Sequence, residues 1–98
     1  MNIKIHSIKF DAGADLLDFV QRKMDKMDKF FDRIVDGEVY LRLNNAGVEN
    51  KTVEIKINLP GDQFFAESSA RSFEKAMEDS AKAIKRKLRK HKEKLVMH

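Results

Sequence analysis

No cysteine occurs among the 98 residues of the chain, and proline appears only once. Without cysteine the protein has no disulfide framework, no thiolate metal ligand and no cysteine nucleophile, so a reducing cytoplasm is the expected location. The sequence also has no apolar run long enough to cross a bilayer, and residues 1–11 contain no apolar segment of the kind found in secretory signals. We therefore expect neither secretion nor a membrane-spanning segment.

Recognisable catalytic and metal-binding patterns are also missing. The four glycines form no phosphate-binding loop, and there is no nucleophile elbow or His-Glu zinc motif. Acidic residues are plentiful, but most are predicted on polar helix faces beside Lys or Arg, without the pocket that a general acid needs. His6 and His98 lack partners at ligand spacing, and His91 falls on an apolar stripe, where packing is the simpler role. The sequence predicts no enzyme: no catalytic residue, no metal site and no cofactor.

Charge is divided unevenly along the chain. Residues 1–81 carry twelve Lys or Arg against fifteen Asp or Glu, a net charge of −3, whereas residues 82–98 carry eight against one, a net charge of +7. This asymmetry favours a nucleic acid or an anionic membrane surface over a small acidic substrate as the partner. Hydrophobic residues make up 42% of the sequence, which is enough for a single core in one domain covering 1–98.

The carboxyl-terminal basic run has the periodicity of a helix. An advance of about 100° per residue brings its apolar and small side chains into one stripe. The stripe consists of Phe73, Met77, Ser80, Ala81, Ile84, Leu88, His91 and Leu95. Because Lys and Arg fill the remaining arc, burial of the stripe fixes the position of every cation. Fixed cations suit a polyanion, and nucleic acid is the first candidate.

Alternating and helical patterns predict the element order β-α-β-β-β-α. The strands are expected at 3–6, 39–43, 52–59 and 64–66. The helices are expected at about 15–32 and 73–95. A shift in the alternation indicates a bend or bulge near Ser7, and Gly37 is expected to end the first helix. Residues 44–47 have hairpin composition, 60–62 form a turn signal, and Ser68, Ser69 and Ser72 are candidate N-caps.

The predicted fold class is α+β, a two-layer α/β arrangement with a four-stranded mixed sheet and two helices on one face, resembling a double-stranded-RNA-binding fold. Short turns make the last three strands antiparallel, and a helical crossover makes the first two parallel. The other sheet face is then open and polar, with Lys4, His6, Arg42, Glu54 and Lys56. Tyr40 and either Phe64 or Phe65 are predicted to face away from the core, where a ring can stack on a base. Partial cover of that ring is the simpler interpretation.

Several segments resemble one known family. Those similar to its first helix and the exit from it are Phe19-Val20, Lys23, Lys26 and Phe31-Asp32-Arg33-Ile34. Those similar to its short strand and second helix are Ala66, Ala76, Arg86, Leu88 and the string KHKEKL at 90–95. On these residues the whole chain resembles the ribosome hibernation-promoting factors and the related ribosome-associated inhibitor protein Y.

The resemblance implies a ribosome-binding domain that blocks translation in stationary or starved cells. The implied partner is the small ribosomal subunit with its ribosomal RNA, bound in the channel for messenger RNA and the anticodon ends of transfer RNA. Such a plug needs cations that engage phosphates without reading bases. The implied RNA-binding residues are Arg22, Lys23, Lys26, Arg33, Lys82, Lys85, Arg86, Arg89, Lys90 and Lys94.

The length of the chain resembles the short form of the family. A monomer without a C-terminal dimerisation domain is expected, so that pairing of ribosomes needs a second factor. No membrane partner is expected.

Other interpretations of the basic run stay open. A merely solvated helix face usually interleaves Glu with Lys, whereas Glu93 is the only acid between 82 and 94. A basic-helix adaptor could bind an acidic protein or an anionic membrane, although the predicted sheet already requires the apolar stripe. A generic double-stranded RNA-binding module is the third interpretation, since it also carries helices on one sheet face.

Overall fold

The computed structural model describes residues 1–44 and 47–96, with side chains described up to residue 94. Its elements are β1 (Asn2–Ile8), α1 (Ala14–Phe30), β2 (Asp36–Leu43), β3 (Lys51–Leu59), β4 (Asp62–Ala70) and α2 (Phe73–Val96). The four strands lie in the order β1-β2-β3-β4, with β1 parallel to β2 and the other neighbours antiparallel. The predicted element order and fold class are confirmed.

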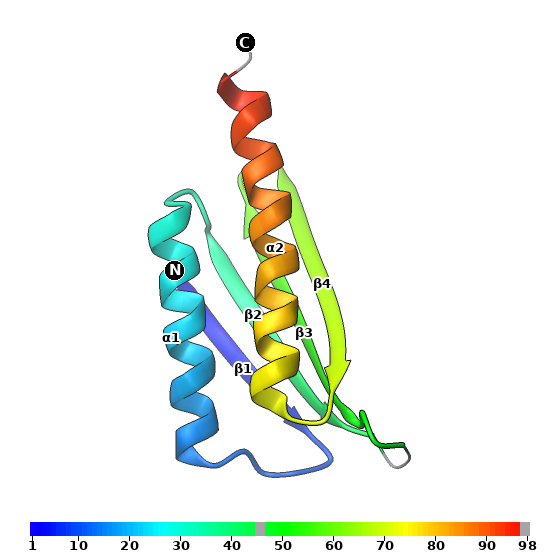
Figure 1. Ribbon diagram of the computed structural model, residues 1–98. Coiled ribbons are helices and arrows are strands. Elements are labelled where there is room, and N and C mark those ends of the chain that lie inside the picture. Colours follow the sequence, from blue (N-terminus) through cyan, green and yellow to red (C-terminus); the bar gives the residue numbers. More distant parts are fainter. Residues whose placement is uncertain (45–46, 97–98) are drawn as a thin grey trace.

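Both helices cover the same face of the sheet, and the opposite face is open (Figure 1). α2 packs over β3 and β4, and α1 lies beside α2 over the β1 side. The two helices run in the same direction, and the last turns of α2 extend beyond the sheet (Figure 1). In the described part of the chain, neither helix is apolar enough over a sufficient length to span a membrane.

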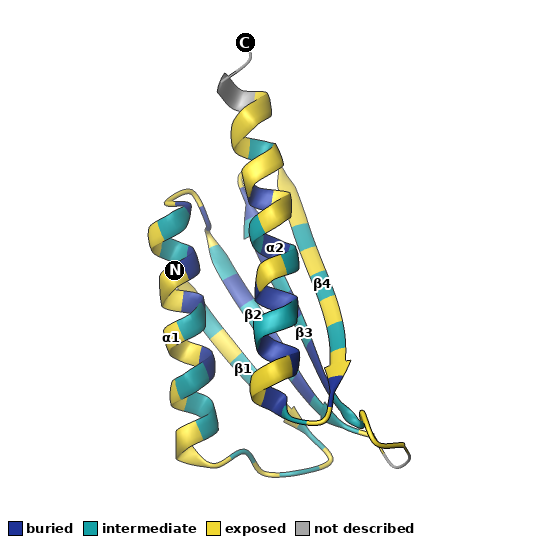
Figure 2. Cartoon of the chain, viewed as in Figure 1, coloured by how far each residue is buried: buried dark blue, intermediate teal, exposed yellow. Residues whose placement is uncertain are grey.

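The core lies between the helix layer and the sheet. α1 contributes Val20, Met24 and Met27, none of which is accessible to solvent. α2 buries the predicted stripe from Phe73 to Leu88, while the side chain of Leu95 lies outside the described residues. Buried and exposed residues alternate accordingly along both helices (Figure 2). The hydroxyl of Ser80 donates to the Val53 carbonyl oxygen at 2.8 Å, so the one polar member of the buried stripe keeps a hydrogen-bond partner.

Two predictions for the first half of the chain are wrong. β1 pairs with β2 without interruption from Asn2 to Ile8, so there is no bulge at Ser7; the chain bends two residues later, where Lys9 has φ 69°. Gly37 does not end α1 but lies inside β2. A Cβ at this position would lie 3.1 Å from Cε of Met24, so the absence of a side chain lets α1 pack closely on the sheet. α1 itself ends at Phe30, slightly before the expected boundary.

The fourth strand is longer than predicted, and two of the candidate caps are wrong. Ser68 and Ser69 belong to β4, and only Ser72 caps α2, where its Oγ accepts a hydrogen bond from the Lys75 amide at 3.1 Å. Small inward side chains in this part of β4, Ser68 among them, hid the strand pattern while leaving room for α2. Gly61, with φ 76°, confirms the predicted turn. Asn45 and Ala46 of the predicted hairpin lie outside the described residues.

Candidate nucleic-acid interface

One row of α1 borders α2 and combines aromatic with basic side chains. Phe19, Lys23, Lys26 and Phe30 recur at the spacing that places residues on one side of a helix. Phe30 identifies that side as the one next to α2, because its carbonyl oxygen accepts a hydrogen bond from Lys92 at 2.8 Å. A shallow cavity of about 300 Å³ is lined by Phe19, Arg22, Lys23 and Lys26. The opposite side of α1 is acidic, and there Asp28 pairs with the terminal amine of Met1 at 2.7 Å.

The facing row of α2 is also basic. Lys85 and Arg89 precede Lys92 by seven and three residues, so they share its side of the helix. Phe30 and Lys92 are in contact, and the residues seven positions earlier in their helices are Lys23 and Lys85. Because the two helices run in the same direction, these two lysines occupy corresponding positions in the facing rows. A second row, made of Lys82, Arg86, Lys90 and Lys94 at successive four-residue steps, begins on the outer side of α2 and turns toward the side of Lys87. The two helices thus form one cationic layer, which we call the helix surface.

The structure brings together on the helix surface nine of the ten predicted RNA-binding residues. The tenth, Arg33, lies in the connection between α1 and β2, at the end of the molecule where both helices finish (Figure 1). Lys23 and Lys85 are half-buried and the other eight are exposed. Across the described residues, none of the ten forms an ion pair. These cations are therefore held in place without being neutralised.

Two cations of the basic run, Lys87 and Lys92, have structural contacts. The Lys87 ammonium donates to the carbonyl oxygen of Phe65 and lies 5.4 Å from the centre of its ring. Lys92 lies 4.6 Å from the ring centre of Phe30 while donating to its carbonyl, at the negative end of the α1 dipole. Sequence reasoning did not separate these anchors from the other cations, because composition does not show which lysine reaches an acceptor.

His91 packs between two aromatic rings. Its ring meets Phe31 and Phe64 edge-on, with centroids 5.8 and 5.7 Å apart. The predicted packing role is confirmed. Among residues whose placement is described, no group of three or more His, Asp or Glu side chains could hold a metal ion.

On the open sheet face, Arg42 and Glu38 each have partners for their charge. Arg42 pairs with Glu54 at 3.1 Å and with Glu67 at 3.7 Å. Glu38 accepts hydrogen bonds from the Tyr40 hydroxyl at 2.8 Å and meets Nε2 of His6 at 3.0 Å. The bond from Tyr40, followed by that from His6, lowers the pKa of Glu38, and the same Glu38 contact raises the pKa of Tyr40.

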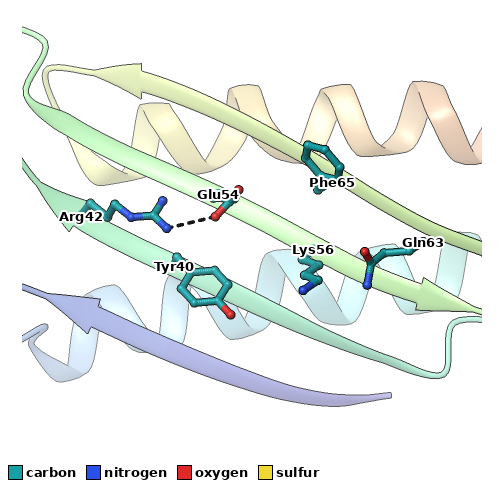
Figure 3. Close-up of a pocket in the computed structure, with 6 residues that line it drawn as sticks. All are labelled: Tyr40, Arg42, Glu54, Lys56, Gln63 and Phe65. Atoms are coloured by element: carbon teal, nitrogen blue, oxygen red, sulfur yellow. Dashed lines mark hydrogen bonds and ion pairs between the residues drawn. The ribbon is translucent and has the colours of Figure 1, made fainter.

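The same face holds a cleft of about 400 Å³ between β2, β3 and β4. Its lining is Tyr40, Arg42, Glu54, Lys56, Gln63 and Phe65 (Figure 3). The sequence left open which of two adjacent phenylalanines faces outward, and the structure shows that it is Phe65, with 57% of its surface exposed. Phe64 packs against the core.

Comparison with known sequences decides the family. The chain matches the model of the family described as sigma 54 modulation protein / S30EA ribosomal protein over residues 3–96. The chain belongs to this family. Among relatives of this S30EA protein, the ribosome hibernation promoting factor of Klebsiella oxytoca is 29% identical over 98 residues, which is 100% of this chain and 98% of the relative. The ribosome hibernation promotion factor of Bacillus subtilis (strain 168) is 27% identical over 97% of this chain, which spans only 50% of that longer relative.

Solved structures share the fold of this S30EA chain. A ribosomal subunit interface protein from Coxiella burnetii matches with a TM-score of 0.83 at 18% identity, covering 94% of this chain and 98% of that one. The N-terminal domain of Protein Y from Thermus thermophilus matches with a TM-score of 0.79 at 22% identity, covering 93% and 99%. The family resemblance seen in the sequence is confirmed.

Proposed function

We propose that this S30EA protein is a ribosome hibernation factor that binds the small ribosomal subunit through phosphates of its RNA. The bound protein occludes the channel for messenger RNA and transfer RNA and silences ribosomes in stationary or starved cells. The names of the Klebsiella and Bacillus relatives support the hibernation role. The observation that carries the RNA contact is the helix surface, whose cations have no acidic partner within the described chain.

The proposed contacts are the ten predicted residues of the two helices and the α1–β2 connection. Because the packed helices fix the backbone positions of these Lys and Arg residues, they lose little conformational entropy when they bind phosphates. Phosphate contacts position a protein without reading sequence. Contact with about five to seven phosphates gives a slope of roughly −4 to −6 for log affinity against log salt concentration. A folded domain of 47 × 23 × 19 Å then fills space in the channel.

The remaining parts of the proposal follow from this role. The protein acts without catalysis, as a monomer in the cytoplasm, where ribosomes are found. Pairing of silenced ribosomes is assigned to a second factor. The occluding unit is the whole S30EA domain.

The test is cosedimentation with isolated small and large subunits over a series of salt concentrations. The variant changes Lys82, Arg86, Arg89 and Lys90 together to Glu. We expect saturable binding of the wild type to the small subunit, weakened by salt with the slope given above, and loss of that binding in the variant. A matched control changes Lys4, Lys9, Lys51 and Arg71 to Glu, because these four cations lie outside both helices and form no ion pair in the described chain. The control should bind like the wild type.

Three outcomes contradict the proposal. Equal loss in the control variant would mean that net charge alone drives binding. Competition by a free RNA duplex as strong as that of the subunit would indicate a generic duplex-binding module. Binding to anionic vesicles as strong as to the subunit would indicate the adaptor.

A further inference from the structure

Phe65 is an aromatic side chain that the fold leaves exposed. The large hydrophobic side chains exposed in the described chain are Val35, Val48 and Phe65. Phe65 lies on the edge strand β4 and projects from the open sheet face, where it lines the cleft of about 400 Å³ (Figure 3). Removing such a ring from water favours an occupant that offers a flat apolar surface.

One lysine contacts this ring and another lines the same cleft. Lys56 is the partner of Phe65 in the β3–β4 ladder, and no carboxylate pairs with it among the described residues. Lys87 reaches the ring from α2 and donates one hydrogen bond to the Phe65 carbonyl oxygen. An ammonium group has three N–H donors, so Lys87 retains two for an anion. Lys87 thus lies against the ring and Lys56 lines the same cleft, so two cations that can bind phosphate are near the ring.

The other aromatic ring of the cleft is already in use. Tyr40 stacks on His6 with centroids 4.7 Å apart, and the Arg42 guanidinium carbon lies 5.3 Å from the Tyr40 ring centre. The paired Arg42 and Glu54 offer donors and acceptors to the edge of a bound base (Figure 3). Phe65 is thus the ring of the cleft that is available for stacking.

The cationic surface of α2 leads to this ring. Lys87, Lys90 and Lys94 share one side of the helix at steps of three and four residues, and Lys87 touches β4. A polyanion lying along this side reaches the edge of β4. The carboxylates of Glu54 and Glu67 on the sheet face limit how far a chain of phosphates can continue past Phe65.

We propose that Phe65 stacks on one unpaired RNA base while Lys56 and Lys87 bind the adjacent phosphates. The ligand class is single-stranded RNA, because each nucleotide of a single strand presents a flat ring between two phosphates. This contact differs from the phosphate contacts of the helix surface, since it requires an unstacked base, and it is measurable without ribosomes.

A single tryptophan provides the test, because the chain has none. Phe65→Trp places an indole at the proposed platform, and base stacking should quench its fluorescence. Val48→Trp is the matched control, since Val48 is also exposed but lies in the β2–β3 connection. With a short single-stranded oligoadenylate, we expect saturable quenching in Phe65→Trp and none in Val48→Trp. Lys56→Gln in the Phe65→Trp background should weaken binding several-fold, and Phe65→Ala should lower affinity about tenfold when binding is followed with labelled RNA.

The proposal is overturned by any of three results. These are absence of quenching in Phe65→Trp, equal quenching in the two tryptophan variants, and equal quenching by inorganic polyphosphate, which has charge but no bases. If a protein partner rather than RNA covers this position, the introduced indole gives the first of these results with oligoadenylate. A protein that sediments with ribosomes but shows no quenching refutes only the stacking site, and quenching without sedimentation refutes only the proposed function.

Discussion

The helix surface and the open sheet face differ in whether their charged side chains have partners of opposite charge. On the sheet face Arg42 meets two carboxylates, and Glu38 is held by Tyr40 and His6. On the helix surface Lys82, Arg86 and Lys90 follow one another at four-residue steps with no carboxylate paired to them in the described chain. Each like-charged pair at this spacing destabilises a helix by about 0.2–0.5 kcal/mol. The paired charges on the sheet face stabilise the fold, whereas the like charges on the helix surface oppose it until an anion binds.

The largest contrast is expected between two residues of α2 that lie two positions apart. Leu88 is fully buried and Lys90 is exposed. Leu88→Ala should lower the free energy of unfolding by about 2–5 kcal/mol through the cavity it creates, whereas Lys90→Ala should change it by less than about 0.5 kcal/mol. Urea unfolding followed by circular dichroism measures both.

Binding should show the reverse order for the same pair. Lys90→Ala should weaken RNA binding and reduce the salt slope by about 1, because one phosphate contact is lost. Leu88→Ala, under conditions where it remains folded, should keep the slope. If Lys90→Ala left both affinity and slope unchanged, the outer row of α2 would not be the interface.

Arg86→Glu should separate stability from binding in one substitution. Arg86 lies four residues from both Lys82 and Lys90, so a carboxylate there turns two repulsions into attractions. We expect the free energy of unfolding to rise by about 1 kcal/mol and the affinity for the small subunit to fall about tenfold or more. Thermal unfolding and cosedimentation measure the two effects. A variant that is both less stable and less able to bind would contradict the view that these cations oppose folding.

Much of the fold could be predicted because hydrophobic residues recur at strand or helix spacing along the main elements. The alternation in β3 and the stripe of α2 each specify one buried face, and the structure places both as expected. The errors fall where side chains are small. Gly37 and Ser68 are typical of helix ends and turns, yet both lie in strands beneath closely packed helices. Tertiary packing overrode local preference at these positions.

The site was predictable to the level of a surface but not of individual contacts. Helical phase was enough to place Lys82 and Arg86 outward. It could not show that Lys87 and Lys92 end on backbone carbonyl oxygens, since those acceptors belong to residues 22 and 62 positions away in the sequence. Nor could the alternation around 64–65 decide which phenylalanine is exposed, because that depends on the register between β3 and β4.

Lys92→Met tests whether this cation is an anchor rather than a phosphate contact. The variant keeps an unbranched side chain but loses the hydrogen bond to the α1 carboxyl end, which should reduce stability by about 0.5–1 kcal/mol. Because α1 and α2 lose a link, affinity for the small subunit should fall modestly while the salt slope stays unchanged. Lys90→Met is the matched control, because Lys90 is exposed and lies before the last turn of α2, and it should lower the slope by about 1 with little effect on stability. A lowered slope in Lys92→Met would make Lys92 a direct contact, and Lys92→Arg should restore stability if the anchor role is correct.

The smallest expected effect is the pH dependence of stability that comes from the Tyr40–Glu38 hydrogen bond on the sheet face. The Tyr40 hydroxyl donates to Glu38, which lowers the pKa of Glu38 from 4.5 and raises the pKa of Tyr40 from 10.0. The stabilisation from Glu38 is present above pH 4.5 and is lost as pH falls through its lower folded-state pKa. That from Tyr40 is present below pH 10.0 and is lost as pH rises through its higher folded-state pKa.

Tyr40→Phe should therefore remove the part of the alkaline loss of stability that comes from Tyr40, and should reduce the acidic loss from Glu38 only in part, since the His6 contact to Glu38 remains. Tyr40 is the only tyrosine of the chain, so phenolate absorbance in the wild type reports its pKa directly. The Glu38 carboxyl can be followed by carbon NMR in both proteins. Arg42→Gln is the control, because it disturbs the neighbouring ion pairs while leaving the Tyr40–Glu38 bond in place. An unchanged Glu38 titration in Tyr40→Phe would mean that His6 alone holds the carboxylate, and the charge matching of the sheet face would then rest on the ion pairs rather than on this hydrogen bond.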